Sequence, residues 1–242
     1  MTDVGEPGEA VSKIRSAAAR PKRWFDREGT EFGRGIGFFD AIYGFAITLL
    51  IANLDLPPAE AWVSIEALLG SGLGDQLLAF GISFVVIAVF WKANANLMSR
   101  FRGIDSPVIV ANLLSAGLVV MLPFTTQGIS EAGLSDLPLP TALYAVNVAL
   151  VIVAGQLVFE VGAARGLLAD PSPARVRWAW RVDALAQVAV FAVSIPVAYL
   201  AGADWGRATW IALAVVSPLT GRWAARVADR ARIRDDWVVE RE

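Results

Sequence analysis

Charged residues divide the chain into long uncharged stretches separated by short charged segments. A helix that crosses about 30 Å of hydrocarbon at about 1.5 Å per residue needs about 20 mostly apolar residues. Six stretches approach or meet this length and predict helices over 35–54, 76–91, 106–124, 138–159, 183–202 and 205–221. The last has only 14 uncharged residues, between Arg207 and Arg222, and Pro218 lies near its end. Tilting of the helix, or extension of the two arginine side chains towards water, would still let it cross a membrane.

Composition agrees with this pattern. Apolar residues make up 56% of the 242 residues, charged residues only 18%, and the mean hydropathy is +0.54. These values are typical of an all-α protein with several membrane spans. The chain has neither cysteine nor histidine, which excludes disulfides, thiolate metal sites and histidine-based catalysis. Nothing resembles a nucleotide-binding GxxxxGK[ST] loop, so we expect no enzyme, no cofactor and no nucleic-acid partner.

The 21 basic residues are concentrated on one side of the predicted spans. Twenty lie before the first span, in the second and fourth connections or after the last span, and only Arg207 lies elsewhere. Because basic residues accumulate in cytoplasmic loops, this predicts six crossings of a cell membrane with both termini in the cytoplasm. We therefore divide the chain into a cytoplasmic arm (1–33), a six-span domain (34–221) and a cytoplasmic helical tail (222–242).

The first span contains a carboxylate, Asp40, six residues after Arg34. An ionisable group at membrane depth is costly unless it is paired or hydrated. Six helical residues turn through about 240°, which places Arg34 and Asp40 on different faces. Their partners are therefore expected on other helices, and we interpret Asp40 as a residue that holds helices together. Glu160 and Asp183, beside Arg165 and Arg181, are interpreted as ion pairs at the membrane interface and assigned to no site.

Several short motifs occur in a fixed order along the first three spans. Arg34 is followed by Phe38-Phe39-Asp40, the second span ends in Phe90-Trp91, and the third contains Asn112-Leu113-Leu114 and ends in Leu122-Pro123-Phe124-Thr125-Thr126. This order resembles the prokaryotic branch of the transmembrane protein 175 family of potassium channels. The motifs cover residues 34–126, and the number of spans and the topology extend the resemblance to the whole chain.

The match includes departures from the family pattern. Phe39 replaces a serine, Asn94 and Ala95 replace paired histidines, and Thr125 replaces a proline. The resemblance implies a structural polar network between the first three spans, which in this chain would use Arg34, Asp40, Trp91, Asn94 and Asn112.

The resemblance also implies a homotetramer in which four copies of the first helix line a central pore for potassium ions. No TVGYG-like segment is present to form a carbonyl filter, so side chains would meet the ion. Helical spacing places one stripe along the first span, and we predict that it forms the gate: Phe45, Thr48, Leu49 and Ala52. A ring of Phe45 side chains would oppose a hydrated cation, and a ring of Thr48 hydroxyls would replace part of its hydration shell. Asp55 is the candidate charge at the pore mouth.

Other interpretations are open at this point. An apolar stripe at helical spacing is often a packing face inside a helix bundle. Pro123 and Pro196 would suit the broken helices of a secondary transporter, although no second copy of the Arg-x-x-x-Phe-x-Asp pattern marks an inverted half. The altered stripe would also suit a membrane scaffold that does not conduct. We favour a passive potassium-permeable channel whose partners are potassium ions, the lipid bilayer and other copies of itself.

Overall fold

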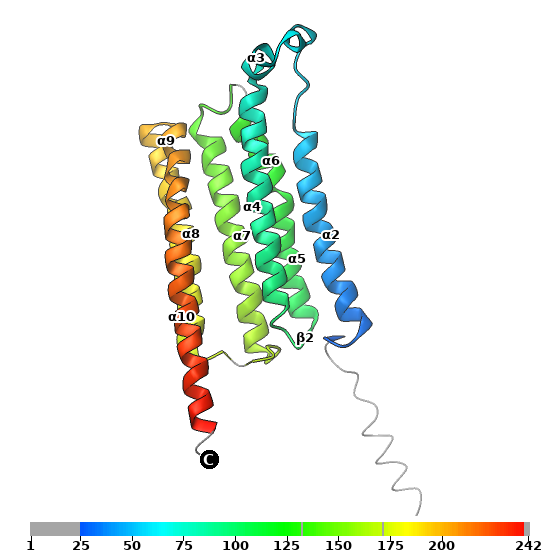
Figure 1. The fold of residues 1–242 in the computed structure, drawn as a ribbon, viewed down its shortest axis with the longest axis vertical. Helices are drawn as coiled ribbons and strands as arrows, with labels where there is room; N and C mark the ends of the chain where they lie inside the picture. Colours follow the sequence, from blue (N-terminus) through cyan, green and yellow to red (C-terminus); the bar gives the residue numbers. More distant parts are fainter. Residues whose placement is uncertain (1–24, 132, 171, 240–242) are drawn as a thin grey trace, which may run out of the picture.

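The computed structural model describes residues 25–131, 133–170 and 172–239, with side chains described as far as residue 231. The described residues form an upright helical bundle with one small two-stranded sheet at one end (Figure 1). The main helices are α2 (Thr30–Ala52), α4 (Gly74–Met98), α5 (Ser106–Val120), α6 (Leu122–Ser130), α7 (Pro138–Ala164), α8 (Ala174–Ala201) and α10 (Leu213–Val239).

Shorter elements connect these helices at the two ends of the bundle. One end carries β1 (Phe25–Asp26) and β2 (Gly103–Ile104). The other carries the 3₁₀ helix η1 (Ala59–Val63), α3 (Ile65–Leu68), the π-helical turn η2 (Leu69–Leu73), α9 (Ala203–Ala208) and the 3₁₀ helix η3 (Thr209–Ala212). The start of α2 and the end of α10 lie at the same end of the bundle (Figure 1).

Five helical segments among the described residues are long and apolar enough to cross a membrane. They are Thr30–Ala52, Ile65–Met98, Ser106–Ser130, Pro138–Ala164 and Ala174–Ala201. They overlap the first five predicted spans, of which 35–54 and 183–202 extend two residues and one residue past the helix ends. The sixth predicted span, 205–221, lies across α9, η3 and the start of α10, so its crossing stays a prediction. The predicted domain boundaries fall within α2 and α10. Residues 1–24 of the predicted arm and 240–242 of the predicted tail lie outside the described residues.

Local sequence signals explain where several helices begin and end. Asp105 caps α5, since its side chain accepts a hydrogen bond from the backbone N–H of Val108 at 3.2 Å. Pro123 at the start of α6 interrupts the helical ladder, which separates α5 from α6. Gly202 ends α8 with a φ of 109°, a conformation that side-chain-bearing residues avoid.

Three connections are joined by backbone hydrogen bonds at the end of the bundle that carries the sheet. Phe25 pairs with Ile104 in antiparallel register. The N–H of Arg102 donates to the carbonyl of Leu167 at 2.9 Å, and the N–H of Ala169 donates to the carbonyl of Arg100 at 2.8 Å. The segment before α2, the α4–α5 connection and the α7–α8 connection are therefore held together independently of side-chain packing.

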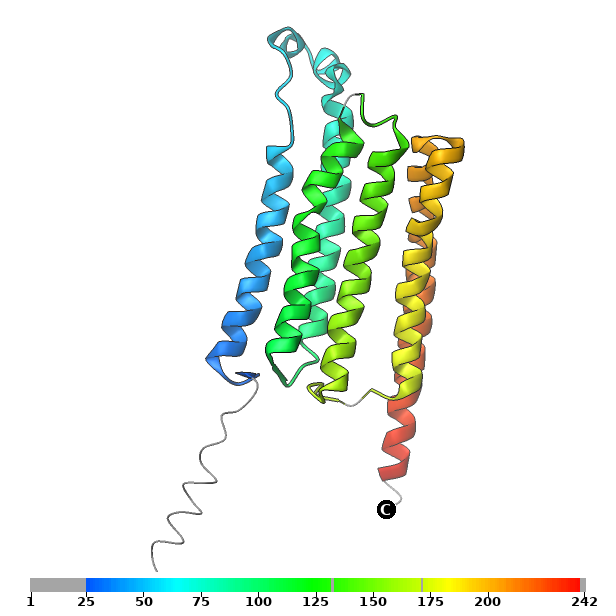
Figure 2. The ribbon, with the colours of Figure 1, turned by 180° about the vertical axis from the view of Figure 1, so that it is seen from behind.

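The two sides of the bundle carry different helices. Helix α2 packs on α4, α5 and α6, whereas α10 packs along α8, which itself packs on α7. Both ribbon views place α2 at one edge and the α8–α10 pair at the opposite edge (Figures 1 and 2). Helix α2 is therefore a peripheral helix of this single chain.

The ring of Phe101 requires a glycine on α7. Phe101 is fully buried, and a Cβ atom added at Gly162 would overlap its ring. We predict that Gly162→Ala lowers the free energy of unfolding by about 1–3 kcal/mol, because an overpacked core must shift to accept the methyl group. The measurement is chemical unfolding of the purified protein in detergent, followed by circular dichroism.

Gly155→Ala is the matched control on the same helix, because nothing lies within 4 Å of a Cβ atom at Gly155. There the change is expected to be neutral or stabilising, since alanine favours helix over glycine. Equal destabilisation by both variants would show that the effect is not caused by Phe101.

Candidate functional site

Helix α2 has two opposite faces. One face is buried against the rest of the bundle and consists of Phe39, Tyr43, Ala46 and Leu50, each at most 2% exposed. The other face carries the predicted gate residues Phe45, Thr48, Leu49 and Ala52, all of which are exposed. Phe45 is 71% exposed, although it lies only two residues from buried Tyr43. The predicted stripe is therefore not a packing face within a single chain.

The hydroxyl of Thr48 is oriented by its own helix. Its Oγ1 donates a hydrogen bond to the carbonyl of Phe45 at 2.8 Å. A hydroxyl has one donor hydrogen and two acceptor lone pairs. Because the hydrogen is used within α2, the remaining lone-pair capacity of Thr48 suits a cation or a water hydrogen.

The end of α2 is attached to two neighbouring helices. The side-chain amide of Asn53 donates to the carbonyl of Pro123 at 2.8 Å. The backbone N–H of Asp55 donates to Oε1 of Gln76 at 3.0 Å. These bonds fix the backbone on which Asp55, the predicted mouth charge, lies exposed to solvent.

The predicted polar residues form two separate pairs. The indole Nε1 of Trp91 donates to Oδ1 of Asp40 at 2.8 Å and joins α4 to α2. The amide of Asn94 donates to Oδ1 of Asn112 at 2.5 Å and joins α4 to α5. Among the described residues, no hydrogen bond or ion pair connects exposed Arg34 to these four side chains. The structure thus brings together four of the five predicted residues, as pairs and not as one network.

Two further polar contacts lie inside the bundle. The hydroxyls of Ser83 on α4 and Thr126 on α6 are 2.7 Å apart. The amide of Asn147 on α7 lies 3.2 Å from the hydroxyl of Thr125. These contacts were not predicted from the sequence, although polar residues within uncharged stretches were the available signal.

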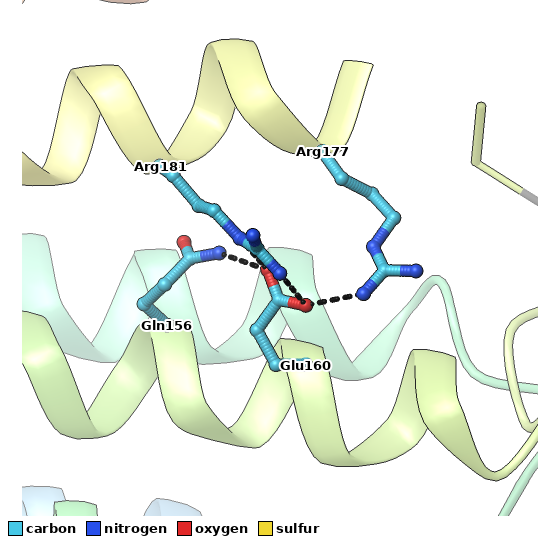
Figure 3. Close-up of polar contacts among 4 residues, drawn as sticks. All are labelled: Gln156, Glu160, Arg177 and Arg181. Atoms are coloured by element: carbon cyan, nitrogen blue, oxygen red, sulfur yellow. Dashed lines mark hydrogen bonds and ion pairs between the residues drawn. The ribbon is translucent and has the colours of Figure 1, made fainter. Parts of the chain in front are cut away.

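Glu160 is the centre of a charged cluster between α7 and α8 (Figure 3). Its Oε2 accepts from Arg177 at 2.6 Å, and both of its oxygens accept from Arg181 at 2.7 Å. Gln156, one turn earlier on α7, donates to Oε1 at 3.0 Å. The carboxylate therefore has two charged partners on α8 and an amide partner on its own helix, α7.

This arrangement corrects two predicted ion pairs. Arg165 pairs with Asp105, at the start of α5, and not with Glu160. Asp183 accepts hydrogen bonds from Thr220 and Gln187, and not from Arg181. Proximity in sequence failed here because residues on one helix face are three or four positions apart. Arg177 and Arg181 are four positions apart, and both side chains reach Glu160.

Within the described part of the chain, no group of three or more acidic residues is arranged to hold a metal ion. The site consists of apolar side chains, one hydroxyl and peripheral charges. Such a surface suits the passage of a weakly held ion better than its tight coordination.

Comparison with known proteins finds similarity to one channel family over part of the chain. A sequence model described as endosomal/lysosomal potassium channel TMEM175 matches residues 34–123. A potassium channel of Streptomyces collinus is 30% identical over 130 residues, which are 54% of this chain and 62% of that protein. A potassium channel of a Chryseobacterium species is 23% identical over 109 residues, 45% of this chain and 54% of that protein. The matches therefore span about half to three-fifths of these relatives.

A solved structure has the same fold. The crystal structure of a lysosomal potassium-selective channel TMEM175 homolog from Chamaesiphon minutus matches with a TM-score of 0.58 at 21% sequence identity. The match covers 82% of this chain and 98% of that one. The likeness therefore extends well beyond the segment that carries the sequence motifs.

The Asn94–Asn112 pair gives a prediction for stability. Asn112 is fully buried and Asn94 is 9% exposed, so Asn112→Leu leaves the Asn94 amide without its partner. We expect a loss of about 1–3 kcal/mol in the free energy of unfolding, and a smaller additional loss when Asn94→Leu is combined with it. Chemical unfolding of the two single variants and the double variant measures the coupling.

Asn96→Leu, the same change at an exposed position of α4, is the control and is expected to shift stability by less than about 0.5 kcal/mol. Strictly additive losses at positions 94 and 112 would contradict the pairing.

Proposed function

From the confirmed resemblance to the TMEM175 family over residues 34–123, we propose that the chain forms a potassium-permeable channel in a cell membrane. That family is a channel family and not an enzyme family. The observation that carries the proposal is the exposed face of α2. It presents an aromatic ring, a hydroxyl and aliphatic groups on the side opposite to the one that packs on the bundle.

The proposed topology has six crossings with both termini in the cytoplasm. Successive long helices alternate in direction, and α10 runs antiparallel to α8 along most of its length (Figures 1 and 2). The one-sided distribution of basic residues supports a cytoplasmic location for the end that carries the sheet.

The proposed assembly is a homotetramer with α2 closest to the fourfold axis. The position of α2 at one edge of the bundle supports this arrangement, because four copies brought together at that edge would enclose the exposed face of α2 (Figure 1). In this assembly the contacts of Trp91 with Asp40 and of Asn53 with Pro123 are structural, because they hold α2 on its own subunit.

The proposed mechanism uses side chains in sequence along the pore. The exposed carboxylate of Asp55 would raise the local concentration of cations at the mouth. Thr48 oxygens would replace part of the ion's hydration shell, and the ring of Phe45 side chains would form the hydrophobic constriction. No cofactor is needed, since the ion moves down its electrochemical gradient.

Bi-ionic reversal potentials of the purified protein in planar bilayers test this function. A channel gives single-channel events and a reversal potential displaced towards that of potassium when potassium and sodium oppose each other. Saturable flux that depends on a second gradient would indicate a transporter, and absence of flux would indicate a scaffold. Chemical cross-linking in detergent, followed by mass measurement, tests the tetramer independently.

The absence of native cysteines allows a direct test of the sixth span. Ala208 and Ala225 are exposed and lie before and within α10. We predict that Ala208→Cys and Ala225→Cys react with an impermeant maleimide from opposite sides of sealed vesicles, because α10 crosses the bilayer between them. Labelling of both from the same side would show that α10 does not cross, and the cysteine-free parent chain measures background.

The proposed constriction at Phe45 gives a prediction for conductance and selectivity. We expect Phe45→Ala to raise conductance by about tenfold, equivalent to about 1.4 kcal/mol less barrier, and to weaken discrimination between potassium and sodium. The reason is that a ring of methyl groups leaves room for a hydrated ion. Single-channel recording is the measurement.

Ile51→Ala is the control, because Ile51 is also exposed (58%) but lies about 120° away from Phe45 around the helix. Its currents should match those of the parent. Unchanged conductance and selectivity in Phe45→Ala would remove Phe45 from the gate.

A further inference from the structure

The exposed face of α10 changes from apolar to cationic part of the way along the helix. Val215 and Leu219 are 60% and 61% exposed, and Trp223 is 42% exposed. From that level onward the exposed side chains include Arg222, Arg226 and Arg230.

Helical geometry places the apolar and cationic groups on the same face. At 100° per residue, all six positions fall within a sector of about 100°. Ala224 and Ala231, which are buried, lie on the opposite side of the helix. The arginines therefore continue the line of Val215 and Leu219 and do not face α8.

Neighbouring helices acquire charge at the same level. Thr220 of α10 donates to Asp183 of α8, which fixes the register of the two antiparallel helices. Arg181 and Arg177 lie two and six residues before Asp183 on α8, which is about half a turn and 1.7 turns, and both pair with Glu160 of α7 (Figure 3). The first charges of three helices thus lie close to one plane, as expected at the boundary between hydrocarbon and headgroups.

The two groups of arginines differ in their partners. Arg177 and Arg181 both pair with Glu160, whereas no ion pair with Arg222, Arg226 or Arg230 occurs among the described side chains. Guanidinium groups bind phosphate oxygens through paired hydrogen bonds. Arginine side chains are also long enough to reach back towards the bilayer surface.

We propose that Arg222, Arg226 and Arg230 bind the phosphate headgroup of an anionic phospholipid whose acyl chains lie along Val215 and Leu219. The proposal rests on the proposed membrane crossing of α10 but not on ion conduction. A lipid is the occupant that fits both halves of this face, because a soluble anion would not explain the apolar half and an apolar peptide would not explain the arginines.

Native mass spectrometry of the full chain in detergent tests the proposal. The protein is offered equal amounts of phosphatidylglycerol and phosphatidylcholine, and the ratio of bound lipids is measured. We expect the parent chain to favour phosphatidylglycerol, and Arg226→Gln to lower the ratio about fivefold. The triple glutamine variant should lose the preference, and the triple lysine variant should retain most of it.

Arg34→Gln is the charge-matched control, because Arg34 is exposed on α2 at the opposite side of the bundle (Figure 1). Its lipid ratio should equal that of the parent. An unchanged ratio in the triple glutamine variant, or an equal fall in Arg34→Gln and Arg226→Gln, overturns the proposal. If the triple variant loses helical content by circular dichroism, Arg226→Gln decides alone.

A soluble headgroup distinguishes a lipid from a free anion. Glycerol phosphate should not displace phosphatidylglycerol at equal concentration, and displacement would overturn the assignment to lipid. Lipid retention is measured without ion flux, so a protein that does not conduct would refute the channel and leave this result unaffected. Same-side labelling of the two cysteine variants would refute the crossing of α10, and with it the lipid site.

Discussion

The structure depends on the burial of one face of α2 against its own bundle. Phe39, Tyr43, Ala46 and Leu50 give α2 an apolar seam, and its neighbours α4, α5 and α6 accept it. In a bilayer, packing and hydrogen bonds rather than water exclusion hold helices together. The bonds from Trp91 to Asp40 and from Asn53 to Pro123 fix the rotation of α2, and this rotation leaves Phe45 and Thr48 facing outward.

Two carboxylates that are shielded from water pair with arginines. Glu160 is only 19% exposed and has two guanidinium partners, and Asp105 is 5% exposed and pairs with Arg165. A buried charge without a partner would be costly. Arg222, Arg226 and Arg230 of α10 do not face this constraint, because they are exposed, and their exposure makes them available to an external anion.

Periodicity and charge counting predicted much of the fold, but not how the helices meet. The first five spans and the exposed stripe of α2 each depend on the periodicity of a single segment. They can therefore be predicted from the sequence. The pairing of Glu160 with Arg177 and of Arg165 with Asp105 depends on the rotation and register of two helices. The backbone bonds between the three connections involve short segments without any periodic signal. Neither kind of contact is encoded locally.

Arg34 and Asp40 lie on different faces of α2, and Phe39 adds no polar group between them. The resemblance placed a serine at this position, where a hydroxyl would extend a polar network along α2. Phe39 is instead 2% exposed and belongs to the apolar seam, and its ring neither donates nor accepts a conventional hydrogen bond. Asp40 then depends on Trp91, and Asn94 and Asn112 satisfy each other. This part of the structure thus contains two hydrogen-bonded pairs in place of one network.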